Sequence, residues 1–203
     1  MEYDLVGWHD DDDGGGPQVR LDYRAFAYAG KFVMSATGVA LVRDERDPLA
    51  LDVGADEPAQ FGDPTVVAAV AFNEDRTDPE TLWLRYVTVR GDRRGEGIGP
   101  RLVAFVCEHA RERGYARCRI AVNNVFSYEA LAKVGFAFTG RETGLAEVVL
   151  DRDLRGGSGV DTDTYQRGLD VFRGRDCSDA ERAFLKARDG AGPPERIDPP
   201  VEE

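Results

Sequence analysis

A glycine-rich turn between a strand and a helix constrains the fold of this chain most. The stretch from Leu82 to Val89 is rich in aromatic and β-branched residues, which predicts a largely buried strand. From Pro100 to Arg113, apolar residues recur at spacings of three and four, which predicts an amphipathic helix. The connection, 90–99, contains four glycines and three arginines. Since the first N–H groups of a helix lack partners and lie at its positive end, such a turn can bind a phosphate group.

Two common nucleotide-binding motifs do not fit this turn. A Walker A loop requires Gly-Lys followed by Ser or Thr, whereas Gly99 is followed by Pro100 and Arg101. The dinucleotide fingerprint requires a third glycine where this chain has Pro100 or Leu102. For the short glycine pattern alone, a connecting turn with solvated arginines is the simplest alternative.

The spacing V-x-x-x-x-R-x-x-G-x-G resembles the acetyl-CoA-binding signature of the GNAT superfamily of N-acetyltransferases. It is filled here by Val89, Arg94, Gly97 and Gly99. A second block, at the expected distance, resembles the family's pattern of Asn, helix and Lys-x-Gly-Phe, and it contains Asn124, Lys133, Gly135 and Phe136. The resemblance covers roughly residues 65–153.

The resemblance implies an α/β fold with a mixed, mostly antiparallel central sheet, splayed middle strands and flanking helices. Within it, the residue patterns predict strands at 65–73, 82–89, 117–122, 136–140 and 145–151, and helices at 100–113 and 125–134. Upstream, Lys31 to Met34 and Val39 to Val42 have the pattern of strands, and the helices that cover the acceptor site in the family are only weakly indicated.

Composition divides the chain into four expected parts. Residues 1–18 form a flexible acidic N-terminal segment, and 19–154 form the GNAT-like domain. A helical extension at 155–190 contains helices at 161–173 and 180–188, with Ser178 or Asp179 as cap of the second. It docks on the parent domain or supports a homodimer. Residues 191–203 are expected to be disordered.

Carried over residue by residue, the resemblance implies a cofactor site. Backbone atoms of Val87 and Val89 would bind the pantetheine arm, and the turn would hold the pyrophosphate. The expected cofactor-binding residues are Val87, Val89, Arg94, Gly95, Gly97, Ile98, Gly99 and Asn124. Asn124 can also cap the helix that follows it. Acetyl-CoA is the expected co-substrate.

The usual general acid of the family is absent. Many members place a tyrosine four residues before the glycine of Gly-Phe, where this chain has Leu131. Tyr128, one helical turn earlier, is the candidate substitute, with a structural role for Tyr128 or protonation by water as alternatives. The candidate base is Glu80, Glu74 or Asp75, all near strand ends, or a water chain, and the spacing selects none of them.

The expected reaction is direct attack of a primary amine on acetyl-CoA in a ternary complex. The acceptor is a small molecule or a peptide whose identity the sequence does not specify. One alternative is a CoA- or acyl-CoA-binding sensor without turnover. The other is that the spacing is a coincidence and the turn binds a different phosphorylated ligand.

The balance of charges excludes some partners. There are 38 acidic residues against 26 basic ones, and only Lys31, Lys133 and Lys186 are lysines. This composition resembles that of haloarchaeal proteins and suits a high-salt cytoplasm. The alternative is an acidic face that attracts cationic substrates such as polyamines or protein tails. Without an extended basic stripe, nucleic acid is not expected as a partner. No apolar run is long enough to span a membrane, and the N-terminus lacks signal-peptide features, which predicts a cytoplasmic protein. The histidines and cysteines lack metal-site spacing.

Overall fold

The computed structural model describes residues 1–8, 19–34, 37–50, 62–156 and 159–200. Among these residues, seven strands hydrogen-bond in the order β1-β2-β3-β4-β5-β7-β6. The elements are β1 (Glu2–Gly7), α1 (Lys31–Met34), β2 (Gly38–Arg43), β3 (Val66–Asp75), β4 (Asp78–Val89), the short 3-10 helix η1 (Gly91–Arg93), α2 (Ile98–Glu112), β5 (Arg117–Val122), α3 (Val125–Ala132), β6 (Ala137–Glu142), β7 (Val148–Asp153), α4 (Thr162–Arg173) and α5 (Asp179–Ala187). The chain divides into two compact units, and β3, β4 and α2 contribute to both.

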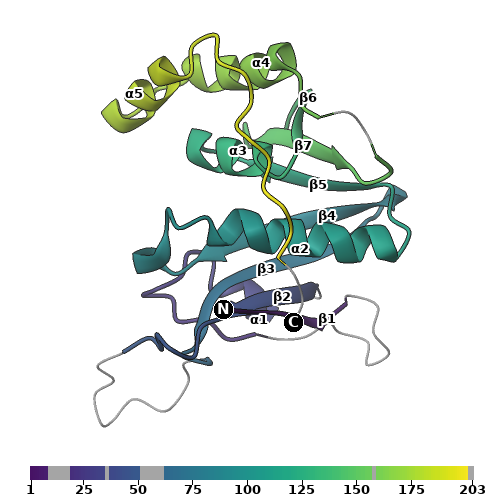
Figure 1. The fold of residues 1–203 in the computed structure, drawn as a ribbon, viewed down its shortest axis with the longest axis vertical. Helices are drawn as coiled ribbons and strands as arrows, with labels where there is room; N and C mark the ends of the chain where they lie inside the picture. The colour runs from purple at the N-terminus through teal and green to yellow at the C-terminus, as the bar shows by residue number, and fades with distance from the viewer. Residues whose placement is uncertain (9–18, 35–36, 51–61, 157–158, 201–203) are drawn as a thin grey trace. The chain divides into compact units, whose positions relative to one another are not determined.

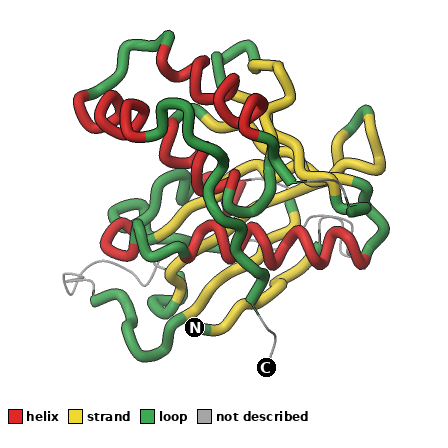
Figure 2. Tube along the Cα trace, turned by 45° about the horizontal axis from the view of Figure 1, so that its top comes forward, coloured by secondary structure: helices red, strands yellow, loops and turns green. Residues whose placement is uncertain are grey.

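Unit 1 comprises Met1–Glu74, Leu84–Val106 and Pro199–Glu203. Its strands β2 and β3 are almost continuously apolar and are buried on both faces. They run antiparallel, with Val39 opposite Ala71. β1 pairs antiparallel with β2, so the three strands lie side by side (Figure 2). This buried sheet is the base from which β4 leads into the glycine-rich turn.

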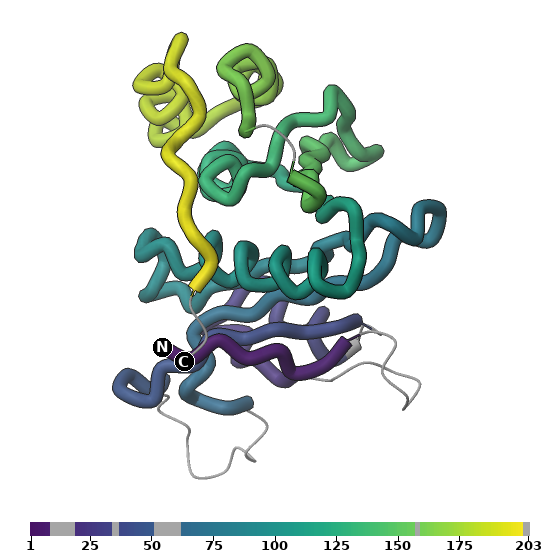
Figure 3. Tube along the Cα trace, turned by 45° about the vertical axis from the view of Figure 1, so that its right-hand side comes forward, coloured from purple at the N-terminus to yellow at the C-terminus, as the bar shows by residue number. Residues whose placement is uncertain are grey.

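Unit 2 comprises Asp75–Trp83 and Cys107–Asp198. Its strand β7 lies between β5 and β6 and is antiparallel to both. Figure 1 shows α3 against β5, α4 against β6, and α5 beside α3 and α4. The chain after α5 then returns along α3, where the Ile197 N–H donates to the Lys133 carbonyl at 2.9 Å (Figure 3).

The C-terminal helices dock on α3 through a buried polar contact. The Tyr128 hydroxyl donates to the Tyr165 carbonyl at 3.0 Å, and the two rings stack with centroids 5.6 Å apart. Glu129 pairs with Arg188 and accepts a hydrogen bond from the Tyr165 hydroxyl. Because helices of 12 and 9 residues are marginal alone, these contacts supply much of the stability of α4 and α5.

The predicted fold class, a mostly antiparallel sheet with flanking helices, is confirmed. The bounds of β5 agree with those expected, and Ser178 caps α5 in a capping box with Glu181. The splay of the middle strands stays a prediction.

Two segments differ from expectation. Residues 31–34 form one helical turn rather than a strand, since an apolar run this short does not distinguish the two. Within the segment predicted to be flexible, residues 2–7 form β1, where Tyr3 packs on Phe105 with ring centroids 5.8 Å apart. The rest of that segment, 9–18, lies outside the described residues, as do the last three residues of the predicted disordered tail.

Replacing Gly168 of α4 by alanine is expected to destabilise unit 2. A Cβ at this position would lie 2.1 Å from the Tyr128 hydroxyl oxygen, and that ring is too buried to move aside. We expect a loss of about 1–3 kcal/mol from overpacking, despite the higher helix propensity of alanine. Urea unfolding measures the loss. Gly144→Ala, where a Cβ meets nothing within 4 Å, is the control. An unchanged midpoint for Gly168→Ala would contradict the close packing of α3 and α4.

Candidate functional site

The glycine-rich turn of unit 1 begins with η1 and opens directly into α2 (Figure 1). Gly95 and Gly97 have φ values of +88° and +77°, a backbone conformation that side chains with a Cβ rarely adopt. The first bond of α2 runs from the Arg101 N–H to the Gly97 carbonyl at 3.3 Å. Pro100 is the third residue of the helix rather than the first, still within the turn whose N–H groups have no helical partner.

The surface of the turn has room for a ligand beside its backbone. A Cβ built at Gly95 would meet nothing within 4 Å, and one at Gly97 would meet only the Arg101 guanidinium, at 3.0 Å from Nη1. At Gly99 the close neighbour is a methyl group of Val89, 3.2 Å away. Gly99 therefore lets α2 pack on the end of β4, while Gly95 and Gly97 leave an open cradle in which a phosphate can approach the backbone.

Arg90 holds the start of the turn in place. Its side chain is 2% exposed. The guanidinium donates to the Asp92 carboxylate at 2.8 Å, to the Asp47 carbonyl at 2.9 Å and to the Asp47 carboxylate. Its backbone N–H donates to the Val67 carbonyl of β3 at 2.9 Å. Burial by itself lowers the pKa of Arg90, but the hydrogen bonds to Asp92 and Asp47 outweigh it and raise the pKa overall. Arg90 thus joins the turn to β3 and to the loop that follows β2.

Arg93 is a second internal brace. It donates to both carboxylate oxygens of Glu96 at 2.9 Å, to Asp47 at 2.8 Å and to Asp44 at 3.3 Å. The hydrogen bond to Glu96 is the main cause that raises the pKa of Arg93. Since its donors are occupied by three carboxylates, Arg93 contributes to the shape of the turn rather than to the capture of a phosphate.

Arg94 and Arg101 are the cations that face outward at the turn. Both are exposed. Among the described residues, Arg94 has one long side-chain hydrogen bond, 3.4 Å to the Val89 carbonyl, and Arg101 donates to the Glu96 carbonyl at 3.2 Å. Arg94 is among the predicted cofactor-binding residues, whereas Arg101 is not. Its spacing of four residues from Gly97 is the signal that could have located it.

Unit 1 thus brings together seven of the eight predicted cofactor-binding residues. Val87 and Val89 are half-buried near the end of β4, and Ile98 is buried at the start of α2. The others lie in the turn or at the first residues of α2: Arg94, Gly95, Gly97 and Gly99. A strand end, open glycines and a helix N-terminus are therefore contiguous.

The remaining predicted residues belong to unit 2. Asn124 caps α3, where its side-chain oxygen accepts from the Ser127 N–H at 2.8 Å. Its amide nitrogen donates to Asn123 Oδ1 at 3.3 Å and has a second N–H for another partner. Tyr128 is 2% exposed, and its hydroxyl is bonded to Tyr165. Burial raises the pKa of Tyr128, which makes the hydroxyl a weaker acid. Leu131, at the position usual for the acid, is buried.

Glu80 lies near the start of β4, at the opposite end of the strand from the turn. Its carboxylate is exposed and pairs with Arg155, and its carbonyl accepts from the Ala116 N–H at 2.8 Å. The geometry around Glu80 therefore shows an ion pair and a strand contact, and its role as a base stays a prediction.

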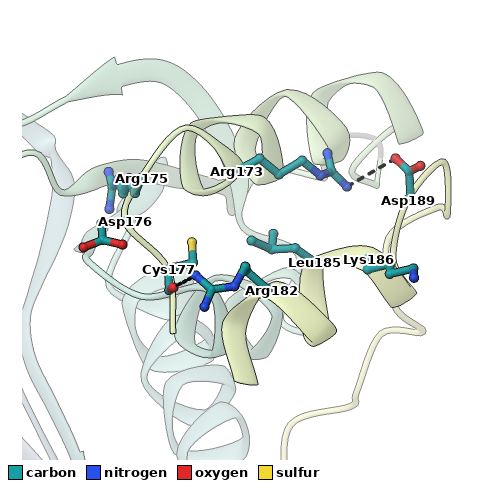
Figure 4. Close-up of a pocket in the computed structure, with 8 residues that line it drawn as sticks. All are labelled: Arg173, Arg175, Asp176, Cys177, Arg182, Leu185, Lys186 and Asp189. Carbon is teal, nitrogen blue, oxygen red and sulfur yellow. Dashed lines mark hydrogen bonds and ion pairs between the residues drawn. The ribbon is translucent and has the colours of Figure 1, made fainter. Parts of the chain in front are cut away.

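Unit 2 contains a pocket with a volume of about 470 Å³, between α4, α5 and their connection (Figure 4). It is lined by Arg173, Arg175, Asp176, Cys177, Arg182, Leu185, Lys186 and Asp189. Its arginines already have carboxylate partners, namely Asp170, Glu142 and Asp179. Because carboxylates of the protein already neutralise these arginines, the pocket is a weaker candidate for an anion-binding site than the glycine-rich turn.

One family model matches the part of the chain that contains the turn. Residues 41–136 match the sequence model of the family described as Acetyltransferase (GNAT) family. The match includes β4, the glycine-rich turn, α2 and α3, and it ends at Phe136. It supports the predicted resemblance to this family over residues 41–136.

Solved structures that resemble this chain are distant from it in sequence. They include a nourseothricin acetyltransferase, with 17% identity over 58% of this chain and 65% of that chain and a TM-score of 0.45. An N-acetyltransferase from Staphylococcus aureus Mu50 has 17% identity over 58% and 68% of the two chains, with a TM-score of 0.45. The PaiA N-acetyltransferase from Thermoplasma acidophilum, solved with coenzyme A, has 17% identity over 46% and 57%, with a TM-score of 0.39. The chain thus spans less than two thirds of the first and third of these. No curated protein sequence matches it.

Among the described residues, every helix is too short or too polar to cross a membrane. The same part of the chain contains no group of three or more His, Cys, Asp or Glu side chains arranged to hold a metal ion.

Arg90→Met is expected to weaken the fold of the turn, because it removes a buried cation, leaves the Asp92 carboxylate and the Asp47 carbonyl without the Arg90 donor, and leaves the Asp47 carboxylate with Arg93 alone. We expect a loss of about 1–3 kcal/mol in the free energy of unfolding. The same substitution at exposed Arg94 is the matched control and should change stability by less than about 0.5 kcal/mol. Urea denaturation of both variants checks this, and equal losses would refute the assignment of Arg90 as the brace.

Proposed function

We propose that the protein is an N-acetyltransferase that transfers the acetyl group of acetyl-CoA to a primary amine. The observation that carries the proposal is the glycine-rich turn, which opens into a helix N-terminus within the GNAT match and leaves its backbone accessible at Gly95 and Gly97. Amide groups at a helix N-terminus are suited to a pyrophosphate. Acetyl-CoA carries a pyrophosphate, a peptide-like pantetheine arm and a reactive thioester, so one ligand accounts for both the turn and the strand end.

We propose different contributions to cofactor binding from the glycines and the arginines of the turn. Gly95, Gly97 and Gly99 would present backbone amides to the pyrophosphate, while Arg94 and Arg101 supply charge from outside the cradle. Exposed backbone atoms of Val87 and Val89 would bond the pantetheine amides as an added strand does. Asn124 is proposed to contact the cofactor through the amide group that its capping role leaves available.

The proposed reaction occurs in a ternary complex. The neutral amine nitrogen attacks the thioester carbonyl, the C–N bond forms, the C–S bond breaks, and CoA leaves as the thiolate. The nitrogen loses one proton to a base, and the thiolate gains one from an acid. Glu80 stays a predicted base, and a water chain is the alternative.

The role of Tyr128 as general acid stays a prediction, and the surroundings of its hydroxyl do not favour that role. Its hydroxyl is buried, bonded to the Tyr165 carbonyl, and made less acidic by burial. We propose that water protonates the thiolate and that Tyr128 positions α3. The same observation keeps a second function open, a CoA- or acyl-CoA-binding sensor without turnover, because neither Leu131 nor Tyr128 offers a free proton donor at the expected place.

The acidic composition belongs to the same proposal. A net charge of −12 suits an enzyme of a high-salt cytoplasm, where excess carboxylates keep the surface hydrated. A small molecule or a peptide is the proposed source of the amine, and a homodimer through the C-terminal extension stays a prediction.

Gly97→Val should abolish acetyl-CoA binding, because its side chain would occupy the cradle. The residue's φ of +77° adds backbone strain of roughly 1–2 kcal/mol for any L side chain. Gly114→Val is the matched control, since Gly114 has φ +89° and open space but lies beyond the C-terminal end of α2. Calorimetric titration of acetyl-CoA in molar KCl should give normal affinity for Gly114→Val and none for Gly97→Val. Unchanged affinity in Gly97→Val would refute the cradle.

Tyr128→Phe separates the two roles of the tyrosine. Losing a buried hydrogen bond should cost about 1 kcal/mol of stability. The value of kcat, followed by CoA release with an amine panel, should stay within about twofold if water is the acid, whereas losing a general acid lowers rates by roughly 100-fold or more. A large fall in kcat with unchanged acetyl-CoA affinity would restore Tyr128 as the acid. Acetyl-CoA binding without CoA release by the unmodified protein would favour the sensor.

A further inference from the structure

The segment 19–34 of unit 1 is held against the strand and the turn that we assign to acetyl-CoA. Its residues Phe26, Ala29 and Phe32 are buried in a core cluster, and Tyr86 of β4 packs against the same cluster. The Ala25 carbonyl accepts from the N–H of Gly91, the first residue of η1, at 2.9 Å. This segment is therefore fixed beside both the glycine-rich turn and the residue that precedes Val87.

At this place the exposed Tyr28 pairs with the half-buried Tyr86. The rings of Tyr28 and Tyr86 have centroids 5.9 Å apart and an angle of 34° between their planes. Tyr28 is 52% exposed and has a φ of +60°, which is unusual for a bulky residue. Its carbonyl accepts from the Lys31 N–H at 2.8 Å, which helps to hold this conformation. Residues held in such sparsely populated backbone conformations cluster at active sites and ligand-binding regions.

A cation already lies on this aromatic pair. The Lys31 ammonium nitrogen is 5.9 Å from the centroid of the Tyr86 ring, within the range of cation–π attraction. Lys31 is exposed at the start of α1 and is one of three lysines in the chain. Its side chain is flexible, so a cation brought by a ligand can take its place on the ring.

The cation held by Tyr86 cannot be the nitrogen that reacts. Attack on the thioester requires a neutral amine, whereas an aromatic face stabilises the charged form of the group that it binds. A substrate that uses this face therefore needs two nitrogens, one that is charged and bound and one that is neutral and reactive.

We propose that the acceptor is a diamine or polyamine, whose second, positively charged nitrogen replaces Lys31 on the Tyr28–Tyr86 pair. The inference rests on the proposed acetyl transfer and adds the class of the acceptor and two residues that recognise it. The net negative charge of the chain also favours a cationic acceptor, because it raises the local concentration of cations.

A matched pair of acceptors tests the inference. (2-Aminoethyl)trimethylammonium carries a fixed positive charge, and 3,3-dimethylbutylamine is its neutral isostere. The two amines differ in intrinsic reactivity, so the quantity to compare is the ratio of their kcat/KM values in the wild type and in each variant. Tyr86→Leu should lower that ratio roughly 3- to 30-fold, and Tyr86→Phe, which keeps the ring, should preserve it.

Two further variants complete the test. Tyr23→Leu is the control, because Tyr23 is 75% exposed and its ring faces Arg24, at 6.0 Å, outside the pair. It should leave the ratio unchanged. Lys31→Gln removes the competing cation and should lower KM for the charged acceptor severalfold without changing kcat.

The outcomes separate this inference from the function on which it rests. An unchanged ratio in Tyr86→Leu, with normal turnover, would overturn the inference alone. If Tyr86→Leu fails to bind acetyl-CoA, Tyr28→Leu replaces it in the same comparison, and an unchanged ratio there overturns the inference equally. Absence of acetyl-CoA binding by the wild type would overturn the proposed function and the inference together.

Discussion

The buried guanidinium of Arg90 is the interaction on which the candidate site depends. A charge removed from water must be paired, so Arg90 requires Asp47 and Asp92 to stay where they are. Asp47 in turn also accepts from Arg93, which is bonded to Glu96 on the other side of the turn. One loop after β2 thereby fixes both ends of η1. The backbone that we assign to the pyrophosphate is organised before any ligand arrives, which reduces the entropy that binding must overcome.

This arrangement gives the arginines of the turn two different tasks. Arg90 and Arg93 are saturated by carboxylates of the protein, whereas Arg94 and Arg101 are exposed. In a chain with 38 acidic residues, a phosphate competes with many internal anions for every cation. The internal carboxylates are paired with Arg90 and Arg93, so Arg94 and Arg101 at the edge of the turn are available to a phosphate. The cradle itself relies on backbone amides, which internal carboxylates do not neutralise.

In unit 2, the C-terminal extension engages the polar side chains of α3. Tyr128 is bonded to Tyr165, and Gly168 leaves the space that the Tyr128 ring fills. Glu129 is held by Arg188 on the same helix. At the position where the resemblance predicts the acid, α3 carries the buried Leu131, and we propose that Tyr128 contributes packing rather than a proton. A thiolate is a good leaving group and tolerates protonation by water, so such an exchange of chemistry for stability is compatible with acetyl transfer.

Local patterns in the sequence determined most of the strands and helices, the glycine-rich turn and the family. Periodicity, caps such as Ser178 and glycine spacing act over a few residues, which is why β5 and α5 were predictable almost to the residue. Only the tertiary structure decided which arginines of the turn are paired with carboxylates and which are exposed, because Asp47 lies 43 residues from Arg90 in the sequence. It also decided that Lys31 begins a helical turn over Tyr86 and that the Tyr128 hydroxyl is occupied. Burial and pairing are properties of residues brought together from distant parts of the chain, and no local pattern encodes them.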